Sequence, residues 1–109
     1  MNINDYQKEA HATAKYVDIG EAYVYPTLGL VGEAGELANK VKKIFRDKGG
    51  KLDEETREAV KLELGDILWY VAEIATVLEV SLEEVAGANL QKLASRKGRG
   101  MIQGSGDNR

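Results

Sequence analysis

The sequence has no cysteine, a single proline and a single histidine among its 109 residues. The lack of cysteine excludes disulfides, thiolate metal sites and a cysteine nucleophile. Nowhere do about 18 apolar residues follow one another, so we expect no transmembrane helix and no membrane partner. The first twenty residues also lack the apolar segment of a signal peptide, and we therefore expect a cytoplasmic protein.

Charge and length narrow the class of protein further. A formal net charge of −3 argues against general binding to nucleic acids, which needs a basic surface. With 30% charged and 43% hydrophobic residues, the composition is that of an ordinary globular protein. A chain of 109 residues suits one domain with a small core, so helices that need more burial would find it in a partner chain.

Apolar residues recur at helical spacing along nearly the whole chain, which predicts an all-α fold of four helices. The apolar face of the first helix extends to Val17. The second helix covers residues 26–47, with Pro26 in its opening turn and the helix-stopping pair Gly49 and Gly50 after it. The face of the first helix consists of Ile3, Tyr6, Ala10, Thr13, Ala14 and Val17.

The third and fourth helices begin at predicted N-caps. Asp53 caps the third helix, and Ser81 forms a capping box with Glu84 for a fourth helix that ends at about Arg96. The short link G-G-K-L-D makes the second and third helices an antiparallel hairpin. The apolar stripes of these three helices are Leu30, Ala34, Leu37, Val41, Ile44 and Phe45; Val60, Leu64, Ile67, Val71, Ile74 and Leu78; and Leu82, Ala86, Leu90 and Leu93.

Two matched acidic pairs interrupt the hairpin helices. Glu33 and Glu36 stand in E-A-G-E, and Glu63 and Asp66 stand in E-L-G-D. At about 100 degrees per residue, each pair lies on one flank of its apolar stripe, and the two arms of the hairpin have similar lengths. We therefore expect the four carboxylates to meet across the hairpin.

Four converging carboxylates would repel one another unless they were protonated or held cations. Mg²⁺ fits them, because it prefers oxygen ligands and is often shared between carboxylates and substrate phosphates. Gly35 and Gly65 each lie between the two acids of a pair, where the missing side chain would let a helix or ligand approach. The alternative is a solvated helix surface, on which Glu36 and Lys40 form an ordinary ion pair.

The segments L-G-L-V-G-E-A-G-E-L, E-L-G-D-I and N-L-Q-K-L-A-S-R resemble the MazG-like nucleotide pyrophosphohydrolases, an all-α group of nucleoside triphosphate pyrophosphohydrolases. The resemblance covers residues 6–96. It implies a homo-oligomeric four-helix fold, a dimer or tetramer, and cleavage of nucleoside triphosphates between the α and β phosphates. The products would be a monophosphate and pyrophosphate, with a role in cleaning the nucleotide pool.

The same resemblance assigns roles to particular residues. It implies that Mg²⁺, for which Mn²⁺ could substitute, is held by the four catalytic carboxylates, Glu33, Glu36, Glu63 and Asp66. We interpret residues 1–97 as the catalytic domain and residues 98–109 as a flexible glycine-rich tail.

Cationic and aromatic residues are candidates for binding the substrate. Asn89, Lys92 and Arg96 share one flank of the fourth helix and could hold phosphate oxygens, although Lys92 and Arg96 also complement the helix dipole. The resemblance, which places a similar Asn and Lys near the triphosphate, favours a role in binding. Lys40 and Lys43 lie on the Glu33 flank. The remaining candidates are Tyr70 on the acidic flank, and Tyr23 and Tyr25 for a base pocket.

Two further residues bear more on assembly than on chemistry. Trp69 and Leu62 point away from the main stripe of the third helix, which indicates that this helix is covered on two sides and that a subunit interface lies there. Trp69 could also stack on a nucleobase. His11 falls outside the apolar face of the first helix, and we expect it on the surface.

Other functions remain open at this point. Phosphoribosyl-ATP pyrophosphohydrolase of histidine synthesis has a comparable helical acidic site. A carboxylate-bridged di-iron bundle needs E-x-x-H pairs, and the single histidine is far from either acidic pair. A non-catalytic helical oligomerisation module would use the acids only for solubility.

Overall fold

The computed structural model describes residues 1–100 and 102–107, and these form four α-helices and no strand. The helices are α1 (Ile3–Ala12), α2 (Val24–Lys48), α3 (Glu54–Val77) and α4 (Leu82–Gly98). The prediction of an all-α chain with four helices is confirmed. None of these helices is both long and apolar enough to cross a lipid bilayer.

Local capping explains where the helices begin and end. The Asp53 carboxylate accepts a hydrogen bond of 2.8 Å from the Thr56 amide, and the Ser81 hydroxyl accepts one of 3.0 Å from the Glu84 amide, as predicted. At the end of α2, Gly49 adopts a left-handed conformation with φ of 61°, which favours glycine. Helix α4 continues two residues beyond the predicted end at Arg96.

The predicted continuation of the first helix to Val17 is wrong. Helix α1 ends at Ala12, and the Thr13 hydroxyl donates a hydrogen bond of 2.7 Å to the Ala10 carbonyl. Residues 13–23, hereafter the aromatic segment, contain no regular helix and leave Val17 82% exposed. The side chain of Tyr16 contacts α3 from this segment, so tertiary contacts override the helical periodicity of the sequence.

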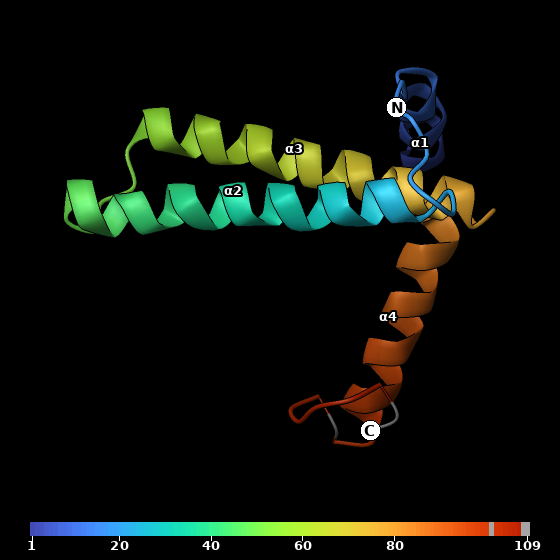
Figure 1. The fold of residues 1–109 in the computed structure, drawn as a ribbon. Coiled ribbons are helices and arrows are strands. Elements are labelled where there is room, and N and C mark those ends of the chain that lie inside the picture. Colours follow the sequence, from blue (N-terminus) through green and yellow to red (C-terminus); the bar gives the residue numbers. More distant parts are fainter. Residues whose placement is uncertain (101, 108–109) are drawn as a thin grey trace.

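Helices α2 and α3 lie side by side and are joined at one end by residues 49–53 (Figure 1). Helix α1 packs near the far end of α3, and α4 leaves that end and extends away from the pair (Figure 1). Within the described residues, α4 contacts α1 and α3 but not α2. The described chain therefore contains the α2–α3 pair and a corner, where α1 and α4 meet the far end of α3. The rest of α4 projects away from this corner (Figure 1).

The core lies in the corner and is small. Ala10, Ala72, Ala75 and Leu82 are buried there, and Tyr6, Trp69, Val71 and Val80 pack around them.

The predicted apolar stripes are buried only in part. Of the α2 stripe, only Ile44 is buried, whereas Phe45 is 71% exposed; on α4, Leu90 is 67% exposed. Two helices side by side can cover only the seam between them, so periodicity located the stripes but not the material that would cover them. A large apolar surface is left on this single chain.

Candidate functional site

Three of the four predicted acids come together between α2 and α3. One carboxylate oxygen from each of Glu33, Glu63 and Asp66 lies within 4.8 Å of the others. Glu36 is exposed on the next turn of α2 and lies outside this group. We refer to Glu33, Glu63 and Asp66 as the acidic group.

The negative charges of the acidic group lie close together and repel one another. The pKa of Glu33 is raised by its hydrogen bond with Glu63, by loss of hydration, and by the negative charges of Asp66, Glu63 and Glu36. Such a group either keeps a proton or holds a cation, because like charges at this distance oppose joint ionisation.

Within the acidic group, Glu63 has a buried oxygen whose hydrogen-bonding requirement is not met. Its Oε1 lies 3.4 Å from the Lys40 ammonium nitrogen, and its side chain is 13% exposed. Its Oε2 is buried and has no hydrogen-bond partner among the described residues. A buried anionic oxygen without a donor is costly. The donor set therefore fits a hard divalent cation such as Mg²⁺, whose preferred ligands are carboxylate oxygens and water.

A hollow of about 300 Å³ lies beside the acidic group, and Glu33, Asp66, Trp69 and Tyr70 line it. The ring centroids of Trp69 and Tyr70 are 5.0 Å apart at 87°, an edge-to-face contact. Burial and the nearby charges of Tyr25, Glu33 and Asp66 raise the pKa of the Tyr70 hydroxyl. The hollow therefore has two acidic and two aromatic walls.

The glycine that matters for this hollow is Gly29, which sequence reasoning missed. A Cβ at residue 29 would overlap the ring of Tyr70, so α2 approaches that ring only because residue 29 has no side chain. At Gly35 and Gly65, a Cβ would meet no atom of the described chain within 4 Å. Their predicted close approach therefore does not occur inside this chain.

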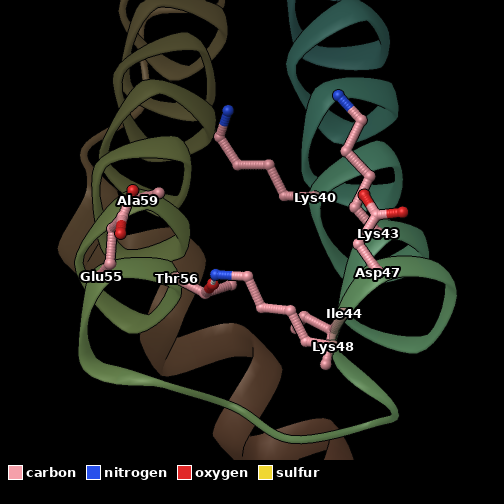
Figure 2. A pocket seen from close by; sticks show the side chains of 8 residues that line it. All are labelled: Lys40, Lys43, Ile44, Asp47, Lys48, Glu55, Thr56 and Ala59. Carbon is pink, nitrogen blue, oxygen red and sulfur yellow. Dashed lines mark hydrogen bonds between the residues drawn. The ribbon is translucent and has the colours of Figure 1, made fainter.

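Lys40 reaches across the helical pair to Glu63, and not along α2 to Glu36 as the solvated alternative supposed. Towards the link, Lys40, Lys43 and Lys48 line a second hollow of about 250 Å³ (Figure 2). Lys48 binds the Asp53 carboxylate at 2.6 Å and the Thr56 hydroxyl at 2.9 Å. Lys48 thus connects the end of α2 to the start of α3, across the link.

Asn89, Lys92 and Arg96 lie on α4, which makes no contact with α2 within the described residues and extends away from the α2–α3 pair (Figure 1). The Lys92 ammonium lies 3.1 Å and an Arg96 guanidinium nitrogen 3.2 Å from one oxygen of Asp107. Arg96 is 5% exposed at its side chain, and its Nε has no hydrogen-bond partner among the described residues. Two of the three predicted phosphate ligands, Lys92 and Arg96, therefore bind an anionic oxygen, and this chain itself provides it.

Sequence reasoning missed the contacts of the aromatic segment. Tyr16 stacks on Tyr25 with centroids 4.6 Å apart, and it meets Trp69 edge-on at 6.3 Å. Trp69 thus packs against its own chain on the side predicted to form a subunit interface, whereas Leu62 is 68% exposed. Tyr23 is the N-cap of α2 and half exposed. The available signal was Glu73, an acid inside the apolar run V-A-E-I-A, which required a buried partner.

Residues 26–100 match the MazG nucleotide pyrophosphohydrolase domain. The whole chain is 54% identical over 114 aligned residues to the "Gene 37 protein" of Mycobacterium phage L5, and the alignment covers both proteins completely. It is 37% identical over 73 residues to the "Uncharacterized protein YvdC" of Bacillus subtilis (strain 168), covering 62% of this chain and 68% of that protein. No solved structure matches the chain.

Proposed function

Because the chain belongs to the MazG nucleotide pyrophosphohydrolase family, we propose that it hydrolyses ribo- or deoxyribonucleoside triphosphates between the α and β phosphates with Mg²⁺. The products are a nucleoside monophosphate and pyrophosphate, and the role is removal of unwanted nucleotides in the cytoplasm. The acidic group, with its buried unpartnered Glu63 oxygen, is the observation that carries this proposal.

The acidic group would hold Mg²⁺, together with Glu36 from the neighbouring turn. When bound, the ion supplies charge neutralisation at the phosphoryl oxygens and a more acidic water. One of the four carboxylates accepts the proton of the attacking water. Lys40 lies next to Glu63, where its ammonium group can also contact a phosphate oxygen.

The aromatic wall of the hollow provides a place for the nucleoside. Tyr70 and Trp69 face the same hollow as Glu33 and Asp66, so a nucleotide with its phosphates at the acids could place its base or sugar against the rings. A π-face accepts every base, which fits an enzyme whose base preference is set by smaller contacts at the edge of the hollow.

A second copy of the chain is part of the proposal. The α2–α3 pair exposes Leu62, Phe45 and Val31, and α4 exposes Leu90. Burying these surfaces against another copy would give the missing core, at roughly 25 cal/mol for each Å² of apolar surface removed from water. In such an oligomer, α4 of one copy can bring Asn89, Lys92 and Arg96 to the acids of another.

Product analysis tests the reaction. Purified protein is incubated with Mg²⁺ and a panel of ribo- and deoxyribonucleoside triphosphates, with phosphoribosyl-ATP as a separate substrate. We expect monophosphate and pyrophosphate, and we expect Glu36→Gln to weaken turnover. Diphosphate and orthophosphate would contradict the bond assigned, and exclusive cleavage of phosphoribosyl-ATP would transfer the proposal to that reaction. No turnover and no response of thermal stability to Mg²⁺ or nucleotide would favour the non-catalytic module.

A further inference from the structure

A carboxyl group lies in the core of the chain, away from the acidic group. Glu73 of α3 is 1% exposed, and its neighbours Ala72 and Ala75 belong to the buried core. Burial of an acid is costly unless its oxygens have hydrogen-bond partners. A glutamate at this position therefore needs a reason beyond packing, since an aliphatic residue would fill the space more cheaply.

Both oxygens of Glu73 have partners that come from the N-terminal part of the chain. The Tyr16 hydroxyl donates a hydrogen bond of 2.8 Å to Oε2, and His11 Nδ1 lies 3.0 Å from Oε1. Burial, followed by the hydrogen bond to Glu73 and its negative charge, raises the pKa of Tyr16 to about 12, so this phenol stays a donor at neutral pH. Glu73 thus connects α3 both to α1 and to the aromatic segment.

The bond to Tyr16 matters because the aromatic segment has no helical hydrogen bonds to hold its shape. Tyr16 is stacked on Tyr25 at an interplanar angle of 4°, and its ring meets Trp69 at 76°. Trp69 in turn donates a hydrogen bond of 2.9 Å from Nε1 to the Thr13 hydroxyl at the start of the segment. The indole ring is therefore fixed by two residues of the segment, Thr13 and Tyr16.

The fixed indole is also a wall of the hollow beside the acids. Trp69 lines that hollow with Tyr70, Glu33 and Asp66, and Tyr70 packs edge-on against Trp69. A chain of direct contacts therefore runs from Glu73 through Tyr16 to Trp69, and then to the hollow.

We propose that Glu73 is a positioning residue: through Tyr16 it holds the aromatic segment against Trp69 and so sets the aromatic wall that receives the nucleoside part of the substrate. The inference rests on the proposed function for its substrate, but the positioning of Trp69 can be measured without any substrate. It assigns Glu73 no contact with the substrate or the metal.

Three substitutions separate positioning from general support of the core. Glu73→Gln keeps an oxygen that can accept the Tyr16 hydrogen bond, whereas Glu73→Leu fills the space and removes the anchor. Glu73→Leu avoids a cavity but leaves the Tyr16 hydroxyl without its acceptor, so we expect it to fold with reduced stability, which circular dichroism and thermal melting check first. Tyr16→Phe removes only the hydroxyl group and keeps the ring.

Trp69 is the only tryptophan in the sequence, so its emission spectrum reports the wall directly. We expect the emission of Glu73→Leu and Tyr16→Phe to shift relative to wild type, and that of Glu73→Gln to stay close to it. His11→Asn is the matched control, because His11 contacts the other oxygen of Glu73 and does not line the hollow. Its emission should remain that of wild type.

Kinetics provide the second measurement. With a nucleoside triphosphate, Glu73→Leu and Tyr16→Phe should raise KM by roughly 10-fold, the scale of one lost hydrogen bond to a charged group, with kcat nearly unchanged. Inhibition by tripolyphosphate, which has no nucleoside, should stay at its wild-type level. Glu73→Gln should restore most of the nucleotide KM.

Two results would overturn the inference. One is wild-type emission and wild-type KM in both Glu73→Leu and Tyr16→Phe. The other is an equal weakening of nucleotide and tripolyphosphate binding, which would indicate general damage to the fold. If the wild-type protein cleaves no nucleotide, the proposed function fails, and the Trp69 emission alone then supports or overturns the positioning of the wall.

Discussion

Glu63 and Glu73 lie on the same helix, and their carboxyl groups have opposite surroundings. Glu73 is 1% exposed, and each of its oxygens contacts a side chain from the N-terminal region. Glu63 is grouped with two further carboxylates, and its buried Oε2 has no partner in the described part of the chain. The hydrogen-bonding requirement of the buried Glu73 carboxyl is thus met within the chain itself. The buried Glu63 oxygen, which lacks a donor and lies among like charges, is instead suited to binding a cation.

The largest expected effect is the loss of activity when Glu63, the carboxylate with an unpartnered oxygen, is replaced. Glu63→Gln keeps the shape of the side chain but removes one negative charge from the acidic group. We expect kcat/KM to fall by about 100-fold or more, because metal-assisted attack needs that ligand. Steady-state kinetics with the preferred triphosphate measure this loss, while circular dichroism should still show a helical protein.

Glu58→Gln is the matched control for that substitution. Glu58 is an exposed acid on α3 that pairs with Lys61 one turn away and takes no part in the acidic group. Its activity should equal that of wild type. Comparable losses in the two variants, or full activity in Glu63→Gln, would remove the distinction between the acidic group and the surface acids.

Replacement of Glu73 should instead lower the stability of the fold and leave Mg²⁺ binding intact. Glu73→Ala leaves the Tyr16 hydroxyl and the His11 ring without their partner and opens a cavity in the core. We expect a loss of ~3 kcal/mol in the free energy of unfolding, which chemical denaturation can measure. The stabilisation of the folded variant by Mg²⁺ should persist, and its disappearance would show that the two carboxyl groups are not separate in function.

Within the acidic group, Glu33 predicts how metal-free stability depends on pH. Its pKa is raised, first by the hydrogen bond with Glu63 and then by burial and neighbouring charges. Its stabilising contribution is therefore complete below the ordinary glutamate pKa and is lost as the pH rises through the higher folded-state value.

In EDTA, the melting temperature of the wild-type protein should therefore rise as the pH is lowered from neutral towards the ordinary range of glutamate. Glu33→Gln should weaken this rise and should melt a few degrees higher than wild type at neutral pH, since a charge in a repelling group has been removed. Melting curves across this pH range test both statements. A neutral-pH melting temperature below that of wild type would show that the carboxylate is not under repulsion.

The smallest effect is expected on α4, where Lys92 and Arg96 bind the carboxylate of Asp107 from the same chain. Lys92 and Arg96 lower the pKa of Asp107 through hydrogen bonds and charge, so this contact is retained at neutral pH. If these cations bind phosphate, Asp107→Asn should lower the nucleotide KM by about twofold, the scale of an exposed ion pair. Glu9→Gln, at an exposed acid of α1, serves as the control. An increased KM would contradict competition between Asp107 and the substrate.

The sequence was sufficient to predict what depends on neighbouring residues. The four helices, the Asp53 and Ser81 caps and the grouping of Glu33 with Glu63 and Asp66 all follow from spacing, turn chemistry and the length of two arms joined by a short link. These features are set by contacts within a few turns of helix, or by the register that a short link imposes.

Contacts between distant segments could not be predicted in the same way. Helix α1 was expected to reach Val17, but Tyr16 is held by Glu73, a residue 57 positions further along the chain. Periodicity likewise identified the faces that carry Phe45 and Leu90 without specifying a partner, and in this chain both residues are largely exposed. Side-chain pairs of this kind depend on where the chain leaves a helix, which local propensity does not determine.

Mn²⁺ binding tests the central claim most directly, because the signal of free Mn²⁺ in electron paramagnetic resonance falls when protein carboxylates take up the ion. Titration of wild type and Glu58→Gln should show uptake of Mn²⁺, and Glu63→Gln should show little or none. If wild type leaves the ion free, or if Glu63→Gln binds it equally well, the acidic group does not hold a divalent cation and the proposed metal-dependent hydrolysis is wrong.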